Sequence, residues 1–282
     1  MGFITITKKL VDSLIPERNA NTHKGDYGKI LLLCGSIGYT GAPALAAMGA
    51  LRSGAGLVYL GVPDSIYTIE AVKMLEPIVL PLKDRDGMLS SEAIYQIEKL
   101  TAHMDAVLIG PGSGSSKGTL SVVRWLLENF EGPVVLDADG INVLKSHKDV
   151  LRGRTSPTIL TPHEGEYLRL GGNLDDGRMD GAIKLAKDLQ VIVVLKGHET
   201  VITDGNDCYL NPTGNPGMAV GGSGDVLAGI LVSLLGQKFA PLDAAVCAVW
   251  LHGAAGDICA REIGQYGMLP SDILGVLPRL LK

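Results

Sequence analysis

A run of four small residues and an aspartate stands immediately before an apolar, helix-like segment. The run is Gly221, Gly222, Ser223, Gly224 and Asp225, and the residues after it carry an apolar stripe at helical spacing. It therefore falls at a helix N-terminus, where unpaired backbone N–H groups and the positive end of the helix dipole can bind a phosphate. A carboxylate beside that phosphate suits a base that deprotonates an attacking hydroxyl. The alternative is that Asp225 caps the helix and the glycines form a turn.

The segment TPHEGE at residues 161–166 follows a short apolar run and places several ionisable side chains together. Glu164 and Glu166 could hold Mg²⁺ through water, as phosphoryl transfer requires. His163 does not begin a zinc-binding H-E-x-x-H motif, because Tyr167 stands where the second histidine would be. Solvated loop charges are the alternative interpretation.

Two further segments could meet a phosphate. Lys196, in LKGHETVITDG, either suits a phosphate as a compact point charge or is an exposed lysine in a turn. GPGSGSSKGT looks like a phosphate loop, but Lys117 precedes Gly118, so the order G-x-x-x-x-G-K-[ST] is absent, and no G-x-G-x-x-G occurs in the sequence. Its glycines can still let the backbone approach a ligand, or they form a plain turn.

These candidate residues follow short apolar runs that end in Gly, Pro or Asp, as strands buried on both faces of a parallel sheet do. The strand-like runs are residues 29–36, 56–63, 106–112, 133–139, 157–162 and 191–197. Helix-like segments are residues 41–54, 90–100, 117–130, 175–189, 225–235 and 242–261. Strands that alternate with helices indicate right-handed βαβ units. Residues 200–210 resemble a hairpin with a DG turn.

The pattern predicts the α/β fold class and a single domain over residues 1–282. We expect a largely parallel, doubly wound sheet flanked by helices on both faces. Ligands of such sheets bind beyond the carboxyl ends of the strands, which is where the candidate residues stand.

Composition limits the classes of function. The 282 residues are 46% apolar and 20% charged and include 37 glycines, which suits an enzyme-sized globular protein with many tight turns. A net charge of −5 offers no basic surface for nucleic acid. The four cysteines are far apart, without a CxxC pair or a Cys/His cluster, and predict reduced thiols. The N-terminus lacks the pattern of a signal peptide, and glycines interrupt the apolar stretch at residues 30–51, so we expect a cytoplasmic protein without membrane contact.

Several motifs together resemble those of a known family. YTGAPALAAMGALRSGAG, GPGSG, LDADGIN, LTPHEGE, LKGHETVITDG and GNPGMAVGGSGDVLAG occur in this order. The series is similar to that of the ADP-dependent NAD(P)H-hydrate dehydratases, a branch of the ribokinase-like superfamily. The resemblance runs from about residue 25 to the C-terminus.

The resemblance implies a lyase reaction that repairs nicotinamide nucleotides. Water is removed from the 6S-hydrate of NADH or NADPH while ADP is converted to AMP and phosphate. Phosphorylation would turn the hydroxyl into a good leaving group. Asp225 would be the base, and the N–H groups around Gly222–Gly224 would stabilise the phosphoryl group in transfer.

Binding roles follow from the same resemblance. The hydrated cofactor would contact Ala42, Gly112, His163 and Asp225. The adenine nucleotide would contact Lys196, Gly197, His198, Glu199, Thr200 and Gly224. Glu166 is the candidate for organising Mg²⁺, because the wider superfamily carries Asn-x-x-Glu where this chain has His163 to Glu166.

The resemblance also implies partners. Many bacterial relatives carry an epimerase domain ahead of this one, for which we expect no room here, so a separate NAD(P)H-hydrate epimerase would supply the S epimer. Relatives are often homotetramers, which suggests a homo-oligomer. The nearest alternative is a small-molecule kinase of the same superfamily, such as a hydroxyethylthiazole or hydroxymethylpyrimidine kinase. A nucleotide sensor without catalysis is a more distant one.

Overall fold

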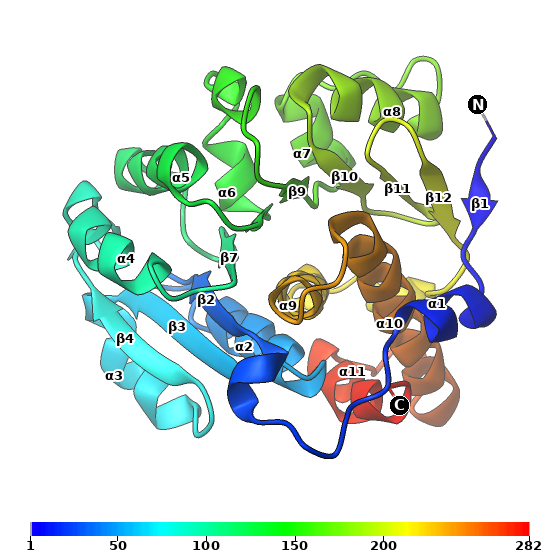
Figure 1. Ribbon diagram of the computed structural model, residues 1–282, viewed down its shortest axis with the longest axis horizontal. Coiled ribbons are helices and arrows are strands. Elements are labelled where there is room, and N and C mark those ends of the chain that lie inside the picture. The colour runs from blue at the N-terminus through cyan, green and yellow to red at the C-terminus, as the bar shows by residue number, and fades with distance from the viewer. Residues whose placement is uncertain (1, 282) are drawn as a thin grey trace.

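The computed structural model describes residues 2–281, which form one ten-stranded sheet between two layers of helices (Figure 1). In spatial order the strands are β1 (Ile4–Thr5), β12 (Cys208–Asn211), β11 (Thr200–Thr203), β10 (Ile192–Leu195), β9 (Thr158–Leu160), β8 (Val134–Leu136), β7 (Ala106–Ile109), β2 (Lys29–Leu33), β3 (Leu57–Pro63) and β4 (Ile78–Leu82). Neighbours are parallel except at β11, which is antiparallel to β10 and β12. A separate small ribbon pairs β5 (Asp84–Arg85) with β6 (Met88–Leu89). The predicted largely parallel sheet is confirmed.

The central strands are apolar throughout because both of their faces are covered. In β2, Ile30 and Leu32 point into one helix layer and Leu31 and Leu33 into the other, and all four are fully buried. This period of two divides the core into two clusters, one on each face of the sheet.

Helices from both halves of the chain build the two layers. On one face lie α1 (Lys8–Leu14), α2 (Gly41–Arg52), α3 (Asp64–Lys73), α9 (Ser223–Gly236), α10 (Pro241–Glu262) and α11 (Pro270–Val276). On the other lie α4 (Ile94–Thr101), α5 (Lys117–Asn129), α6 (Asp139–Asn142), α7 (Glu164–Arg169) and α8 (Arg178–Leu189). Short 3₁₀ helices are η1 (Lys24–Tyr27), η2 (Ser91–Ala93), η3 (Lys148–Leu151), η4 (Pro216–Met218) and η5 (Leu277–Arg279).

Helices α2 and α9 cross backbone to backbone. A Cβ on Gly229 would lie 2.1 Å from the carbonyl oxygen of Ala46, and one on Gly49 would lie 2.7 Å from that of Val226. Only glycine fits at these two positions, because any side chain would overlap a backbone atom of the other helix. The contact fixes the N-terminal ends of the two helices relative to one another.

Helix α10 is long and apolar enough, by length and composition alone, to cross a membrane. Within the protein, 72% of its apolar window is buried. It packs against α9 and the β10–β12 region, so it is a core helix of this fold (Figure 1).

Candidate active site

The predicted site segments meet at the carboxyl ends of β8, β9 and β10, where a cavity of about 950 Å³ opens above the start of α9. Side chains and backbone from all three strand ends and from the 211–225 segment form its wall. The lining residues are Asp137, Ala138, His163, Glu166, Lys196–Thr200, Asn211–Pro216, Met218–Asp225, Leu227, Val249, His252 and Gly253. The anion-binding run, Asp225 and the predicted nucleotide segment therefore share one cavity.

Helix α9 begins at Ser223, and Gly222 precedes it with φ of 98°, in the left-handed region. Glycine suits this position twice, since a Cβ would also lie 2.5 Å from Cδ1 of Leu45. Asp225 is the third helical residue and caps no backbone group. The alternative interpretation of Asp225 as an N-cap is wrong. Its carboxylate lines the cavity at the N-terminus of a fourteen-residue helix, where the N–H of Ser223 donates to the Val220 carbonyl at 3.3 Å.

The environment of Asp225 makes it a weak acid. Burial, reinforced by the charge of Asp137, raises the pKa of the Asp225 carboxyl to about 7, although Lys196 acts in the opposite direction. A carboxylate with this pKa is matched to proton transfer near neutral pH.

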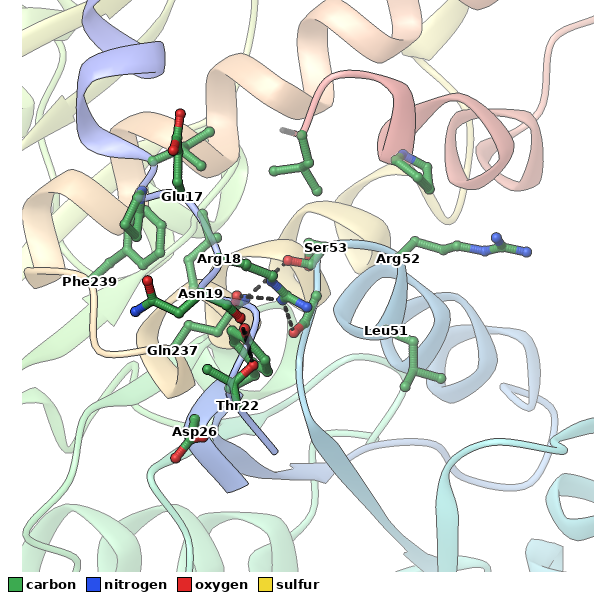
Figure 2. A pocket seen from close by; sticks show the side chains of 17 residues that line it. Glu17, Arg18, Asn19, Thr22, Asp26, Leu51, Arg52, Ser53, Gln237 and Phe239 are labelled. Carbon is green, nitrogen blue, oxygen red and sulfur yellow. Dashed lines mark hydrogen bonds between the residues drawn. The ribbon is translucent and has the colours of Figure 1, made fainter. Parts of the chain in front are cut away.

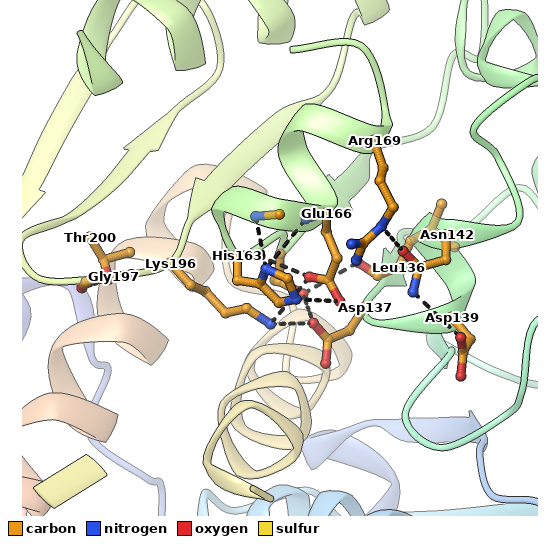
Figure 3. Close-up of polar contacts among 12 residues, drawn as sticks. Leu136, Asp137, Asp139, Asn142, His163, Glu166, Arg169, Lys196, Gly197 and Thr200 are labelled. Carbon is orange, nitrogen blue, oxygen red and sulfur yellow. Dashed lines mark hydrogen bonds and ion pairs between the residues drawn. The ribbon is translucent and has the colours of Figure 1, made fainter. Parts of the chain in front are cut away.

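Lys196 is not an exposed turn lysine. Its Nζ donates to Oδ1 of Asp137 at 2.7 Å and lies 4.0 Å from Oε2 of Glu166, while Thr161 donates to the same Asp137 oxygen at 2.7 Å. Figure 3 shows the side chains of Lys196, Asp137 and Glu166 directed toward one another. Burial alone would lower the pKa of Lys196, but Asp137 and Glu166 keep it raised, so the ammonium stays charged.

His163 and Glu166 hold each other at the start of α7. Nδ1 of His163 accepts the N–H groups of Gly165 at 3.0 Å and Glu166 at 3.3 Å, while Oε2 of Glu166 accepts the N–H of His163 at 2.9 Å. This is a reciprocal capping arrangement with histidine as the cap. Glu166 is buried at the cavity wall, whereas Glu164 is directed to Arg178 at the surface. The interpretation as solvated loop charges fails for Glu166. Glu164 is exposed, but it is the first residue of α7 and pairs with Arg178 at 3.1 Å.

The donor set does not form a metal cage by itself. Among residues 2–281, no group of three or more His, Cys, Asp or Glu side chains could hold a metal ion. Asp137 and Glu166 both line the cavity, with the ammonium of Lys196 2.7 Å from Oδ1 of Asp137 and 4.0 Å from Oε2 of Glu166. Mg²⁺ in phosphoryl transfer is commonly bound by one or two carboxylates together with substrate phosphates and water. Asp137 and Glu166 are carboxylates of this kind at the cavity wall.

The turn from Lys196 to Thr200 is held from behind by one guanidinium. Arg178 donates to the carbonyl oxygens of Leu195 and Lys196, each at 3.1 Å, and to those of His198 and Glu199. Within the turn, Oγ1 of Thr200 donates to the carbonyl of Gly197 at 3.0 Å. The backbone facing the cavity is thus preorganised.

Ala42 and Gly112 lie next to each other on the far side of α9. A Cβ on Gly112 would lie 2.9 Å from that of Ala42, and Ser36 donates to the Gly112 carbonyl at 2.7 Å. The described lining residues of the large cavity do not include either of them. Leu45, one turn after Ala42, touches the position of Gly222. The residues predicted to bind the hydrated cofactor, Ala42 and Gly112, and those predicted to bind the nucleotide, residues 196–200, therefore flank the start of α9.

Three features of the site were not identified from the sequence. Asp137 anchors Lys196, Ala138 beside it has an unusual φ of 47°, and His252 lies 3.3 Å from Oγ of Ser223. Burial, followed by the nearby Lys196, lowers the pKa of His252 to about 4, so this imidazole is neutral. Only the place of Asp137 directly after a strand signalled a role.

A second cavity, of about 610 Å³, lies at the opposite ends of α2 and α9 (Figure 2). Arg18 there donates to the Gly54 carbonyl at 2.6 Å and to Gln237 at 3.1 Å, and its guanidinium stacks 3.7 Å from the Tyr27 ring centre. These contacts fasten the N-terminal segment to the helices.

Comparisons with known proteins agree with this geometry. A family model described as NAD(P)H-hydrate dehydratase matches residues 30–279. The bifunctional NAD(P)H-hydrate repair enzyme of Moorella thermoacetica is 44% identical over 96% of this chain, and the chain spans about half (52%) of that relative's length. The ADP-dependent (S)-NAD(P)H-hydrate dehydratase of Bacillus subtilis is 36% identical, with 98% of this chain and 97% of the relative covered.

Solved structures give the same result. The ADP/ATP-dependent NAD(P)H-hydrate dehydratase of Bacillus subtilis, co-crystallised with ATP and Mg²⁺, superposes with a TM-score of 0.85 and 34% identity, covering 99% of this chain and 98% of that one. A ribokinase-like superfamily protein from Enterococcus faecalis gives a TM-score of 0.87 at 26% identity, covering 99% and 95%. The fold is ribokinase-like, and the chain belongs to the NAD(P)H-hydrate dehydratase family.

Proposed function

We propose that this protein dehydrates the 6S-hydrates of NADH and NADPH, with ADP converted to AMP and phosphate. The observation that carries the proposal is the placement of Asp225. Its carboxylate, with a pKa raised to about 7 by burial and Asp137, stands beside the open N-terminus of α9 in a cavity that also contains a buried, charged lysine. A base, an anion cradle and a cation for phosphate are thus within one site.

The reaction would proceed in two steps. Asp225 takes the proton of the ring hydroxyl while the hydroxyl oxygen attacks the terminal phosphorus of ADP. The bond between that phosphorus and the AMP oxygen breaks. The C–O bond of the resulting ester then breaks as the ring-nitrogen lone pair moves inward, and loss of a proton from the adjacent carbon restores the double bond. The N–H groups of Gly222 and Gly224 would stabilise the phosphoryl group in transfer, while that of Ser223 donates to the Val220 carbonyl.

The two sides of the cradle would bind the two substrates. Lys196 and the preorganised turn through Thr200 would hold the nucleotide, together with Gly224. Ala42, Gly112 and the partly exposed His163 would contact the hydrated cofactor. Asp137 and Glu166 would hold Mg²⁺ jointly with the phosphates. Bound there, the ion would neutralise the phosphate charge.

Four further properties belong to the proposal. The chain would act as a single domain in the cytoplasm, as a homo-oligomer such as a tetramer, and together with an NAD(P)H-hydrate epimerase. The last point is supported by relatives whose names describe bifunctional NAD(P)H-hydrate repair enzymes. Light scattering of the purified protein tests the oligomeric state.

The deciding experiment incubates the protein with hydrated NADH and either ADP or ATP. Recovery of the reduced-nicotinamide absorbance, with AMP and phosphate formed from ADP, is the expected result. Failure with both nucleotides contradicts the proposal. A stable phosphorylated product in place of NADH indicates a small-molecule kinase instead.

A further inference from the structure

All residues from 211 to 222 except Gly217 line the cavity, and the segment leads directly into the glycine-rich anion cradle, residues 221–224. It begins beside the predicted nucleotide turn, because Asn211 of β12 pairs with Thr200 of β11. It ends at Gly222, the residue before α9. We call residues 211–222 the wall loop. Its position decides how the nucleotide turn and the cradle face each other.

The wall loop rests directly on helix α10. A Cβ on Gly253 would lie 2.2 Å from Oγ1 of Thr213, and one on Gly256 would lie 2.3 Å from Sδ of Met218. These two glycines, three residues apart on one face of the helix, allow the loop to approach without an intervening side chain. The surface of α10 therefore determines how closely the wall loop approaches the helix.

Asp257, on the same face of α10, holds the wall loop by hydrogen bonds to Gly214 and Asn215. Its Oδ2 accepts the backbone N–H of Gly214 at 3.0 Å, and its Oδ1 accepts Nδ2 of Asn215 at 3.0 Å. Oδ1 of Asn215 in turn accepts the N–H of Gly217 at 3.0 Å and caps the short helix η4. In this series of three hydrogen bonds each donor has one acceptor, and both carboxylate oxygens of Asp257 accept a hydrogen bond.

We propose that Asp257 is a positioning residue for nucleotide binding, which it supports by holding the wall loop through Gly214 and Asn215. Asp257 itself does not line the cavity, so it acts only through the loop. The inference rests on the proposed function, in which the nucleotide would bind in the cavity that the wall loop and residues 196–200 line together.

The direction of the hydrogen bonds provides a sharp test. In Asp257→Asn, the side chain keeps one acceptor for the Gly214 N–H, and its new NH₂ group faces the NH₂ of Asn215. Turning the Asn215 amide relieves that conflict but sets its NH₂ against the Gly217 N–H. Adding Asn215→Asp restores every pair, because the new carboxylate accepts both from the NH₂ group introduced at position 257 and from the N–H of Gly217.

The experiment compares wild type, Asp257→Asn and the double variant Asn215→Asp/Asp257→Asn. ADP affinity is measured by calorimetry, and KM for ADP and for hydrated NADH by absorbance recovery. We expect Asp257→Asn to weaken ADP binding and raise KM for ADP by about tenfold, the effect of one lost charge-assisted hydrogen bond. The KM for hydrated NADH should change little, and the double variant should return to within about threefold of wild type for ADP. Glu262→Gln, an exposed carboxylate on the same helix, is the matched control and should leave both values unchanged.

Wild-type ADP affinity in Asp257→Asn overturns the inference, as does a double variant no better than the single one, or an equal rise of KM for both substrates. If the single variant does not fold, the double variant decides alone, because the inference predicts near wild-type ADP affinity for it and a tenfold loss there overturns it. A wild-type protein that restores no NADH with ADP contradicts the proposed function. Wild-type turnover with an unaffected Asp257→Asn contradicts only the positioning role.

Discussion

Lys196 and Asp137 form a buried ion pair, with Nζ 2.7 Å from Oδ1, at the carboxyl ends of two strands that β9 separates. The lysine side chain is 19% exposed and that of the aspartate 2%. The pair holds the ammonium of Lys196 in a defined position at the cavity wall. The two members of the pair act on Asp225 in opposite directions: Asp137 raises the pKa of the Asp225 carboxyl and Lys196 lowers it.

Lys196→Met should lower both stability and ADP affinity. The substitution leaves Asp137 buried without its ionic partner, and breaking a buried pair in this way costs about 3 kcal/mol. Denaturant unfolding measures the loss, and calorimetry measures ADP binding. Adding Asp137→Asn should recover much of the stability but none of the ADP affinity. Unfolding of Lys196→Met at the wild-type denaturant concentration would show that the pair does not stabilise the fold.

Asp225→Asn should abolish turnover and leave nucleotide binding intact. The amide keeps the size of the side chain but cannot take a proton, and loss of a general base slows reactions by about 10²- to 10⁴-fold. Absorbance recovery with hydrated NADH and ADP measures turnover, and calorimetry measures ADP affinity. Turnover of Asp225→Asn close to that of wild type would exclude Asp225 as the base. If both wild type and Asp225→Asn bind the nucleotide and signal but neither turns over, the protein is a sensor.

Stability should depend on pH through Asp225. Because its folded pKa is raised to about 7, its contribution is fully present below the unfolded value near 4 and is lost as pH rises through 7. Asp225→Asn should therefore match wild type at pH 4 and exceed it above pH 7 by on the order of 2 to 4 kcal/mol. Unfolding curves at a series of pH values test this. The kcat/KM of wild type should also rise with pH near 7, since the base must be ionised. A stability difference independent of pH would contradict the raised pKa.

Arg178→Gln should weaken ADP binding without contacting the ligand. The guanidinium holds four carbonyl groups of the 195–199 segment, and its loss should cost about 2 kcal/mol of stability and loosen the nucleotide turn. Arg178→Lys should not rescue, because an ammonium lacks the planar fork. Arg124→Gln, which removes an exposed pair with Glu128, is the control and should change stability by less than about 0.5 kcal/mol. Equal effects of the two glutamine variants would contradict the assigned role.

Gly229→Ala should destabilise the protein and reduce turnover. Its Cβ would meet the Ala46 carbonyl oxygen at 2.1 Å, and overpacking of this kind costs about 1 to 3 kcal/mol. Gly275→Ala, in α11 with open space around the new methyl group, is the matched control and should be neutral or stabilising by up to about 1 kcal/mol. Thermal unfolding of both variants gives the comparison, and a Gly229→Ala protein as stable as wild type would contradict the tight crossing.

The predicted strands agree with the structure because fully buried strands are continuous apolar runs. Five of the six predicted carboxyl ends extend too far, as in residues 29–36 against Lys29–Leu33, since the apolar pattern continues into residues that leave the sheet. The run 56–63 ends with β3 at Pro63. Helix α3 and strand β4 were not predicted. In α3 only Ile66 and Glu70 are buried, so its sequence has little periodicity, and β4 is an edge strand containing Pro81.

The sequence located the site segments but not the orientation of every side chain. The rule for parallel sheets placed TPHEGE and LKGHET at one edge, as the structure shows. Spacing alone could not separate Glu166, which is buried at the cavity, from Glu164, which faces Arg178. Nor could it separate Asp137 from Asp139, which accepts the N–H of Gly114 at 2.9 Å instead of facing Lys196. Those choices depend on local backbone geometry, including the φ of 47° at Ala138.

The direct contact of α2 with α9 has a consequence for which molecules the enzyme can accept. With no side chain between the helices at Gly49 and Gly229, their backbones are in direct contact, and the contact constrains the separation of the segments that begin near Ala42 and Asp225. In the proposed reaction, the spacing between acceptor hydroxyl and phosphorus donor would then be set when the chain folds, not when ligands arrive. Selection for a bulkier acceptor would have to remodel the surrounding loops, because the helix pair has no freedom to widen.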